Sequence, residues 1–160
     1  MHAEEEEKDL LAILDAVVKE QSQSLEDRAR FLSSEFWEDK RENNKKGKLE
    51  DRGHLGCRIR SKGDGGIYAE WYKTFWVKTS GAEKAKPWGK YIKKGKRDPF
   101  GYNIETLKKM AKPIEKDIVV RTEEAFRILR EQNYCLTQLR KYAKQLEEAN
   151  AKWEALSEGE

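Results

Sequence analysis

Cysteine and histidine, from which many catalytic and metal-binding centres are built, are scarce in this chain. The 160 residues include two of each. Cys57 and Cys135 lack CxxC spacing, so we expect two reduced thiols rather than a disulfide or a metal pair. His2 and His54 are too few for a histidine metal cluster, and no Ser/His/Asp set, HExxH motif or P-loop is visible. The sequence therefore predicts a non-enzymatic protein that holds no metal or cofactor.

Long apolar runs are also missing. No stretch approaches the roughly 18 apolar residues of a membrane span, and the acidic N-terminus lacks the basic start and apolar core of a signal peptide. We therefore expect a cytoplasmic protein without a membrane partner. Charged residues make up 39% of the chain and the mean hydropathy is −1.00. Apolar side chains must then gather on narrow faces, which favours long two-sided helices.

The N-terminal part, from Met1 to about Lys40, has a helical pattern. Its apolar residues recur at three- and four-residue steps: Leu10, Leu11, Leu14, Val17, Val18, Leu25, Phe31, Leu32 and Phe36. The stripe lapses from Glu20 to Ser24, which leaves two alternatives, one helix or two helices with a kink at that point. The residues Asn43 to Gly47 end this helical region.

The C-terminal part also has a helical pattern, with Asn103 as its N-cap. Pro113 means either that a short helix ends near Ala111 and another begins there, or that one helix kinks. Beyond Ile114 the stripe keeps mostly to heptad spacing: Ile118, Ala125, Leu129, Gln132, Leu136, Leu139, Ala143, Leu146, Asn150 and Trp153. Such a helix needs a partner. We favour the first helix, in an antiparallel hairpin; a homodimeric coiled coil is the alternative, and both together are compatible.

Between the helical parts, residues 53–97 have the alternation of a small antiparallel sheet. The first strand is expected over 55–61, a glycine-rich turn over 62–66, and a long second strand from Ile67 to about Val77. The aromatic run at its end predicts a bulge or a change of partner. A polar loop over 79–86 leads through Pro87 into a third strand over 88–93.

The expected fold is therefore α+β, a three-stranded antiparallel sheet flanked by two long helices. We divide the chain into an acidic helical arm (1–42), a basic sheet domain (43–101) and a long C-terminal helix that packs on the arm (102–160).

Charge is distributed unevenly between these parts. Residues 43–112 carry 19 basic and 7 acidic side chains, whereas 1–42 carry 6 and 13 and 113–160 carry 8 and 10. A dense positive region that is interleaved with Trp and Tyr is typical of proteins that bind the phosphate backbone of nucleic acid. A solvated basic face that protects the sheet from aggregation is the competing interpretation.

Alternation along the strands indicates which side chains contact DNA. Arg58 and Arg60 share the polar face of the first strand, and a guanidinium group matches the acceptors of guanine in the major groove. Tyr68, Glu70 and Tyr72 share this face if the turn keeps register. With the lysines and the arginine of the third strand and following loop as backbone anchors, the predicted DNA-binding set is Arg58, Arg60, Lys62, Tyr68, Glu70, Tyr72, Lys73, Lys90, Lys93, Lys94, Lys96 and Arg97.

Three tryptophans lie in the predicted second and third strands. We expect Trp71, Trp76 and Trp88 to pack in the core against the helices, with stacking on bases as the alternative.

The layout of the sheet is similar to that of the arm-binding domains of phage-type integrases, which lay a three-stranded sheet in the major groove. The order of segments, with Phe36-Trp37 in an acidic helix and then CRIRS, IYAEWYK, GKYIKKGK and a long helix from Asn103, resembles the MobI-type auxiliary conjugative mobilisation proteins, over about residues 31–146. This resemblance implies a double-stranded DNA-binding protein that recognises an origin of transfer and helps a separate relaxase, with another transfer protein or a homodimer as further partners.

A second hypothesis has no nucleic-acid role. In it the helical hairpin is a protein-interaction adaptor or inhibitor, whose acidic, heptad-bearing faces dock another protein.

Overall fold

The structure is a computed structural model that describes residues 2–63, 66–77, 81 and 84–159. Its elements are α1 (His2–Lys46), the short 3-10 helix η1 (Leu49–Asp51), β1 (Leu55–Ser61), β2 (Ile67–Val77), β3 (Lys86–Tyr91), α2 (Ile104–Met110) and α3 (Lys116–Glu158). The predicted α+β class is confirmed. Asp64 and Gly65 of the predicted turn, and much of the polar loop that begins at Thr79, lie outside the described residues.

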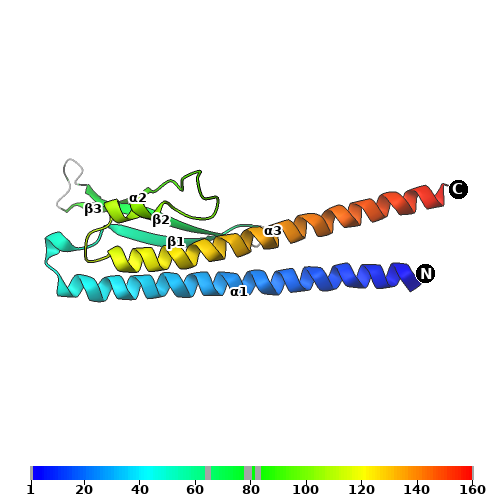
Figure 1. Cartoon of the computed structure of the whole chain (residues 1–160), viewed down its shortest axis with the longest axis horizontal. Coiled ribbons are helices and arrows are strands. Elements are labelled where there is room, and N and C mark those ends of the chain that lie inside the picture. The colour runs from blue at the N-terminus through cyan, green and yellow to red at the C-terminus, as the bar shows by residue number, and fades with distance from the viewer. Residues whose placement is uncertain (1, 64–65, 78–80, 82–83, 160) are drawn as a thin grey trace.

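The two long helices run antiparallel, so that both chain ends lie at one end of the molecule and the sheet lies toward the other (Figure 1). Their apolar stripes meet, with Leu25, Ala29 and Phe36 of α1 in one buried cluster with Ile118 and Phe126 of α3. The favoured intramolecular hairpin is therefore confirmed.

The apolar lapse in α1 does not produce a kink. α1 is a single helix from His2 to Lys46, which is longer than the predicted range. Ser22, at the centre of the lapse, is buried, and its hydroxyl accepts a hydrogen bond from Arg140 of α3. A polar contact between the helices therefore replaces an apolar one at this level.

Of the two alternatives at Pro113, separate helices are correct. The Asn103 side chain accepts a hydrogen bond from the backbone N–H of Thr106, as expected of an N-cap. α2 then ends at Met110, and Ala111 is extended with φ −75° and ψ 141°. The helix therefore ends before Pro113, which has no N–H with which to continue it, and α3 begins after a short turn.

The sheet has the order β1-β2-β3 and is antiparallel throughout. β1 pairs with residues 67–73 of β2, and β3 pairs with residues 72–77. The aromatic end of β2 therefore marks a change of pairing partner from β1 to β3, which was one of the two predicted alternatives. The pairing of this end with β3 is continuous. β3 begins two residues before the predicted position, so Pro87 lies inside it; because β3 is an edge strand, the missing N–H of proline breaks no central ladder.

One face of the sheet packs on both helices, and Trp71 lies at its centre. The indole is fully buried, 5.2 Å from the Phe36 ring and 6.0 Å from the Phe126 ring between centroids. Leu55 and Cys57 of β1 join this core. Cys57 and Cys135 are both free thiols, as predicted.

Side chains of α1 and α3 cover strand edges that would otherwise be unpaired. The indole N–H of Trp37 donates to the carbonyl of Cys57 at 3.2 Å, which occupies the free edge of β1. The β2 edge beyond the reach of β3 is covered by Asn133, which accepts from the backbone N–H of Ile67, and by Arg130, which donates to the carbonyl of Ala69. These contacts protect the sheet from edge pairing with other chains.

Candidate nucleic-acid interface

The face of the sheet that points away from the helices gathers the polar side chains of all three strands. Arg58 is directly opposite Glu70, and Arg60 is opposite Tyr68. The predicted register is therefore correct. We call this surface the outer face, and define it by Arg58, Arg60, Lys62, Tyr68, Glu70, Tyr72 and Tyr91.

Tyr91 is the one member of the outer face that the sequence analysis missed. It is directly opposite Tyr72, and its ring lies 4.2 Å from the guanidinium carbon of Arg58. The third strand was predicted over 88–93 with no register relative to the second strand. The sequence analysis therefore did not show that Tyr91 and Tyr72 share a face. Guanidinium groups stack on aromatic rings in this way, which fixes their orientation.

Glu70 holds both arginines of the outer face. Its carboxylate accepts from Nε of Arg58 at 3.1 Å, and from Nε and Nη2 of Arg60 at 3.0 and 2.6 Å. The hydrogen bond from Arg60 and, after it, that from Arg58 hold the pKa of Glu70 below its ordinary value, although partial burial opposes this. The same contact with Glu70 raises the pKa of Arg60. The Glu70 carboxylate is therefore ionised at neutral pH and stands as one negative charge between two guanidinium groups.

The contact with Glu70 leaves hydrogen-bonding capacity on Arg58. Only its Nε is bonded to Glu70, and within the described chain no acceptor is bonded to its terminal nitrogens. Such a pre-oriented guanidinium is suited to a planar acceptor pair on a base or a phosphate.

Aromatic rings fill the space between these charges. Tyr68 is flanked by Lys62 at 4.2 Å and by Arg60 at 5.0 Å from the ring centroid. The Tyr72 ring lies across Gly56, where a Cβ atom would come within 2.5 Å of the ring. Glycine at this position is therefore required by the ring. The resulting surface alternates cationic and aromatic groups.

The remaining predicted residues do not lie on this face. Lys73 and Lys90 are paired with each other on the opposite side of the sheet. Lys93, Lys96 and Arg97 are exposed in the loop after β3, where the strand was predicted to continue to residue 93.

Lys94 lies in the same loop, but its ammonium donates to the carbonyl of Pro99. Burial and, after it, the charge of Arg130 lower its pKa. The predicted DNA-binding residues thus fall into three groups, which are the outer face, the reverse of the β2–β3 pair, and this loop.

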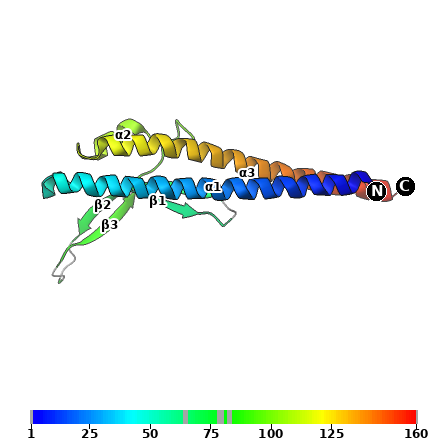
Figure 2. The same cartoon turned by 90° about the horizontal axis from the view of Figure 1, so that it is seen from below.

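The expectation that all three tryptophans are core residues is wrong for two of them. Trp71 is fully buried, but Trp76 and Trp88 are each 64% exposed. The β2–β3 pair projects beyond the helices, so its end has no apolar layer to pack against (Figure 2). Trp88 is directly opposite Phe75, and Trp76 is opposite Pro87, which places the two indoles on opposite faces of the projecting ribbon.

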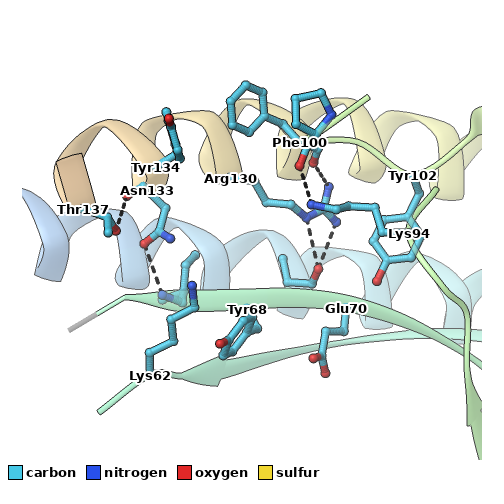
Figure 3. A pocket seen from close by; sticks show the side chains of 13 residues that line it. Lys62, Tyr68, Glu70, Lys94, Phe100, Tyr102, Arg130, Asn133, Tyr134 and Thr137 are labelled. Atoms are coloured by element: carbon cyan, nitrogen blue, oxygen red, sulfur yellow. Dashed lines mark hydrogen bonds between the residues drawn. The ribbon is translucent and has the colours of Figure 1, made fainter. Parts of the chain in front are cut away.

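A cleft of about 420 Å³ lies between the unpaired edge of β2 and α3 (Figure 3). Lys62 and Tyr68 of the outer face line one side of the cleft, and Tyr134 and Thr137 line the α3 side. Its most buried cation, Arg130, is fully used in bonds to protein groups. The cleft therefore joins the sheet to α3 and extends the basic, aromatic surface of the outer face.

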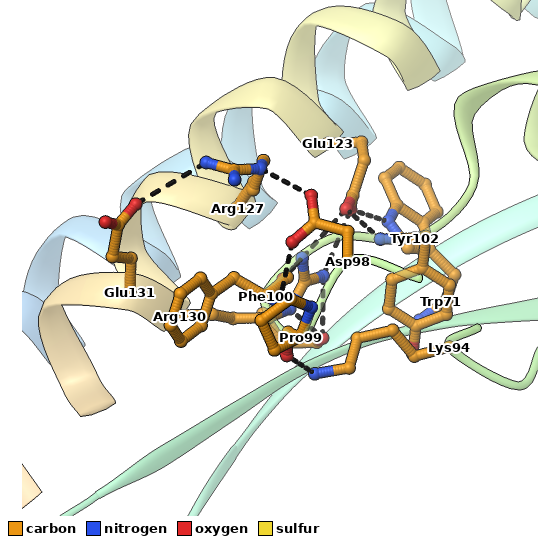
Figure 4. A network of polar contacts seen from close by, with 11 residues as sticks. Trp71, Lys94, Asp98, Pro99, Phe100, Tyr102, Glu123, Arg127, Arg130 and Glu131 are labelled. Carbon is orange, nitrogen blue, oxygen red and sulfur yellow. Dashed lines mark hydrogen bonds and ion pairs between the residues drawn. The ribbon is translucent and has the colours of Figure 1, made fainter. Parts of the chain in front are cut away.

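A buried network behind the cleft fixes the sheet on α3 (Figure 4). The Glu123 carboxylate accepts from Arg130 at 2.8 and 3.0 Å, from the indole N–H of Trp71 at 2.7 Å, and from the backbone N–H of Tyr102 at 2.7 Å. Arg130 also donates to the carbonyl of Phe100. The network was missed in the sequence, although Glu123 falls on the buried stripe of α3 between Val119 and Phe126, where an ordinary heptad carries an apolar residue.

A second buried pair anchors the start of β1. Glu115, just before α3, accepts from the backbone N–H groups of His54, Leu55 and Lys112, and its other oxygen lies 3.6 Å from Nζ of Lys40. Burial lowers the pKa of Lys40, and the charge of Glu115 opposes that shift. These residues hold both helices to the strand that carries Arg58.

Two further features, a metal-binding cluster and a membrane-spanning helix, are absent from the described residues. Among the residues that the structure describes, no three His, Cys, Asp or Glu side chains are grouped so that they could hold a metal ion. Within the same residues, no helix has the length and apolar character needed to cross a membrane.

Comparison with known proteins gives one finding. The model of the family described as MobI protein matches residues 25–144, which include about half of α1, the whole sheet, α2 and the first two thirds of α3. No match was found among curated proteins, and none among solved structures, so the likeness to integrase arm-binding sheets gains no support. Because the family match spans three quarters of the sequence, the chain belongs to the MobI family and is a protein of conjugative mobilisation.

Proposed function

We propose that this protein is a non-enzymatic, double-stranded DNA-binding auxiliary factor that recognises an origin of transfer and assists a separate relaxase. The observation that carries the proposal is the outer face, where Arg58 and Arg60 are held by Glu70 among tyrosines, with side chains that are 42% and 49% exposed. Membership in a mobilisation family supports the biological setting.

The dimensions of the sheet suit the major groove. Strands lie about 4.8 Å apart, so the two-stranded stretch that carries Arg58 and Arg60 is about 5 Å wide, and the outer strands are about 10 Å apart where all three overlap, at residues 72–73. The major groove of B-DNA is about 12 Å wide. A sheet that enters it presents one face to the base edges, and here that face carries two guanidinium groups in a fixed orientation.

The lysines outside the outer face suit a different role. Lys73 and Lys90 lie on the reverse of the ribbon, and Lys93, Lys96 and Arg97 lie in the loop beside it. A sheet in a groove is flanked by the two phosphate backbones, which such peripheral cations contact. In this arrangement the arginines read bases, and the lysines supply affinity that depends on salt.

The test is fluorescence anisotropy of labelled duplexes of about 30 base pairs, one of random sequence and one from an origin of transfer. Wild-type protein is expected to bind both, more tightly to the origin. Arg58→Ala with Arg60→Ala should weaken binding to the origin at least tenfold, about 1.4 kcal/mol, and remove the preference. Lys19→Ala with Lys144→Ala removes the same charge from exposed helix positions and should change affinity less than threefold.

Two results would contradict the proposal. If the wild type binds no duplex at low salt, the basic sheet is not a nucleic-acid surface. If the arginine variant binds as tightly as the wild type and keeps its preference, the outer face is not the contact. Unchanged circular dichroism of both variants shows that the fold is intact.

A further inference from the structure

The exposed side of α3 has an apolar seam that α1 does not cover. Its residues follow the alternating four- and three-residue spacing of a coiled coil over four heptads, namely Ile128, Gln132, Cys135, Leu139, Tyr142, Leu146, Ala149, Trp153 and Leu156. All nine are exposed, with Leu146 at 49%, Tyr142 at 61% and Trp153 at 72%. At 1.5 Å per residue this seam is about 42 Å long.

The contact with α1 uses a different set of α3 positions. Leu129 is buried and Leu136 is partly buried against the shared core, and each follows a seam residue by one position. One residue corresponds to a rotation of about 100° around a helix. The seam is therefore turned to one side of the α1 contact.

α1 has exposed apolar residues in the equivalent place. Val17 precedes the buried Val18, and Phe31 precedes the partly buried Leu32. Leu10 is exposed about two turns before Val17. Two antiparallel helices are related by a two-fold axis perpendicular to the plane that contains them. This rotation exchanges the helices but keeps the two sides of the plane. Residues that precede a contact residue by one position therefore point to the same side of the plane in both helices. The exposed apolar residues of the two helices therefore form one surface.

This surface lies on the side opposite the sheet. The side chains that contact the sheet follow the core positions by one residue, as Trp37 follows Phe36 and Arg130 follows Leu129. Figures 1 and 2 agree that the sheet occupies one side of the helix pair. We call the other side the back face, defined by the nine seam residues of α3 with Leu10, Ile13, Val17 and Phe31 of α1.

The back face is large for a monomer. Its large apolar side chains are between 43% and 72% exposed, and at roughly 150–250 Å² for each large side chain they present on the order of 1,000 Å². The largest apolar patch of an ordinary monomer is about 300–600 Å², whereas each partner in a stable complex buries about 800 Å². The area matches an interface.

We propose that the back face binds a second copy of this chain, so that two helical hairpins form an antiparallel four-helix bundle. Heptad spacing is the geometry with which one helix packs on another, and a two-fold axis lets a single seam serve both copies. The proposal does not depend on the proposed DNA binding.

Charge sets the antiparallel direction. With the axis at Tyr142, the centre of the seam, Glu131 of one copy lies beside Lys152 of the other, twice in the dimer. A parallel dimer would instead bring the two acidic N-terminal segments together. The antiparallel dimer carries its two sheets at opposite ends.

The first test is sedimentation equilibrium of the full chain. The wild type is expected to be a dimer at micromolar concentration, and Leu146→Glu should raise the dissociation constant at least tenfold. Ala151→Glu introduces the same charge at an exposed position outside the seam and should leave the constant unchanged. A monomeric wild type, or a dimer that Leu146→Glu does not weaken, would overturn the proposal.

The second test is oxidative cross-linking. In the antiparallel dimer Cys135 lies opposite Ala149, so Ala149→Cys should form a cross-linked dimer on oxidation. Neither the wild type nor Ala149→Cys with Cys135→Ser should do so, because like positions are then about 21 Å apart along the bundle. Cross-linking of wild-type Cys135 would overturn the antiparallel arrangement, since like cysteines meet only in a parallel one.

Discussion

Replacing Glu123 with glutamine should destabilise the protein more than any comparable change of a surface charge. Each carboxylate oxygen accepts two hydrogen bonds, one of them from Arg130; the others come from Trp71 and from the backbone of Tyr102. A glutamine amide supplies one oxygen and one NH₂ group. Whichever oxygen is replaced, the new NH₂ group points at the two N–H donors that bonded to that oxygen. Arg130 also loses its counter-ion.

The expected loss of stability follows from the burial of Glu123 and Arg130. The side chains of Glu123 and Arg130 are 1% and 10% exposed, and removal of one partner from a buried ion pair costs about 3–5 kcal/mol. The carbonyls that also bind Arg130 offset part of this cost, so a value near 3 kcal/mol is expected for Glu123→Gln. With an m-value of about 2 kcal/mol per M in urea, the midpoint of unfolding should fall by about 1.5 M.

The assay is urea unfolding followed by circular dichroism and by tryptophan fluorescence, since Trp71 is in the network. The matched control is Glu105→Gln, which removes an ion pair with Lys108 whose side chains are 74% and 43% exposed and should cost at most about 1 kcal/mol. If Glu123→Gln costs no more than this control, the carboxylate does not hold the sheet on α3 as described.

Two other predictions concern single residues of the sheet. Glu70→Gln removes a negative charge between Arg58 and Arg60, so titration with a random duplex should show tighter binding; weaker binding would mean that orienting the arginines matters more than repulsion of phosphate. The hydrogen bonds from the two arginines depress the pKa of Glu70 in the folded protein. The contribution of Glu70 to the free energy of unfolding, at most about 1 kcal/mol, is therefore complete above the pKa of Glu70 in the unfolded chain. It is lost as the pH falls through the lower pKa of the folded protein. Acid titration of stability should therefore bring wild type and variant together only below about pH 4. Burial raises the pKa of Cys57 to about 12, so a thiol reagent at pH 8 should leave Cys57 unlabelled in the native protein and label both cysteines after unfolding; two rapid reactions in the native state would refute the burial of Cys57.

Local patterns in the sequence were enough to predict the elements and the register of the first two strands. Apolar residues at three- and four-residue steps predicted both long helices, and alternation from Leu55 placed Arg58 and Arg60 opposite the polar side chains of β2. These features depend on side chains near one another in the chain or across one short turn. Period alone therefore predicts them.

Contacts between distant segments decided the rest. Whether an indole is buried depends on what lies above its strand, so Trp71 is in the core while Trp88 projects past the helices. The position of Glu123 on the apolar stripe of α3 is visible in the sequence, but its partners are not, because they come from a strand, a loop and a later turn of α3. The sequence by itself determined which residues share a face of each helix or strand; only the tertiary structure decided which faces are covered, because coverage depends on how far each element extends over its neighbour.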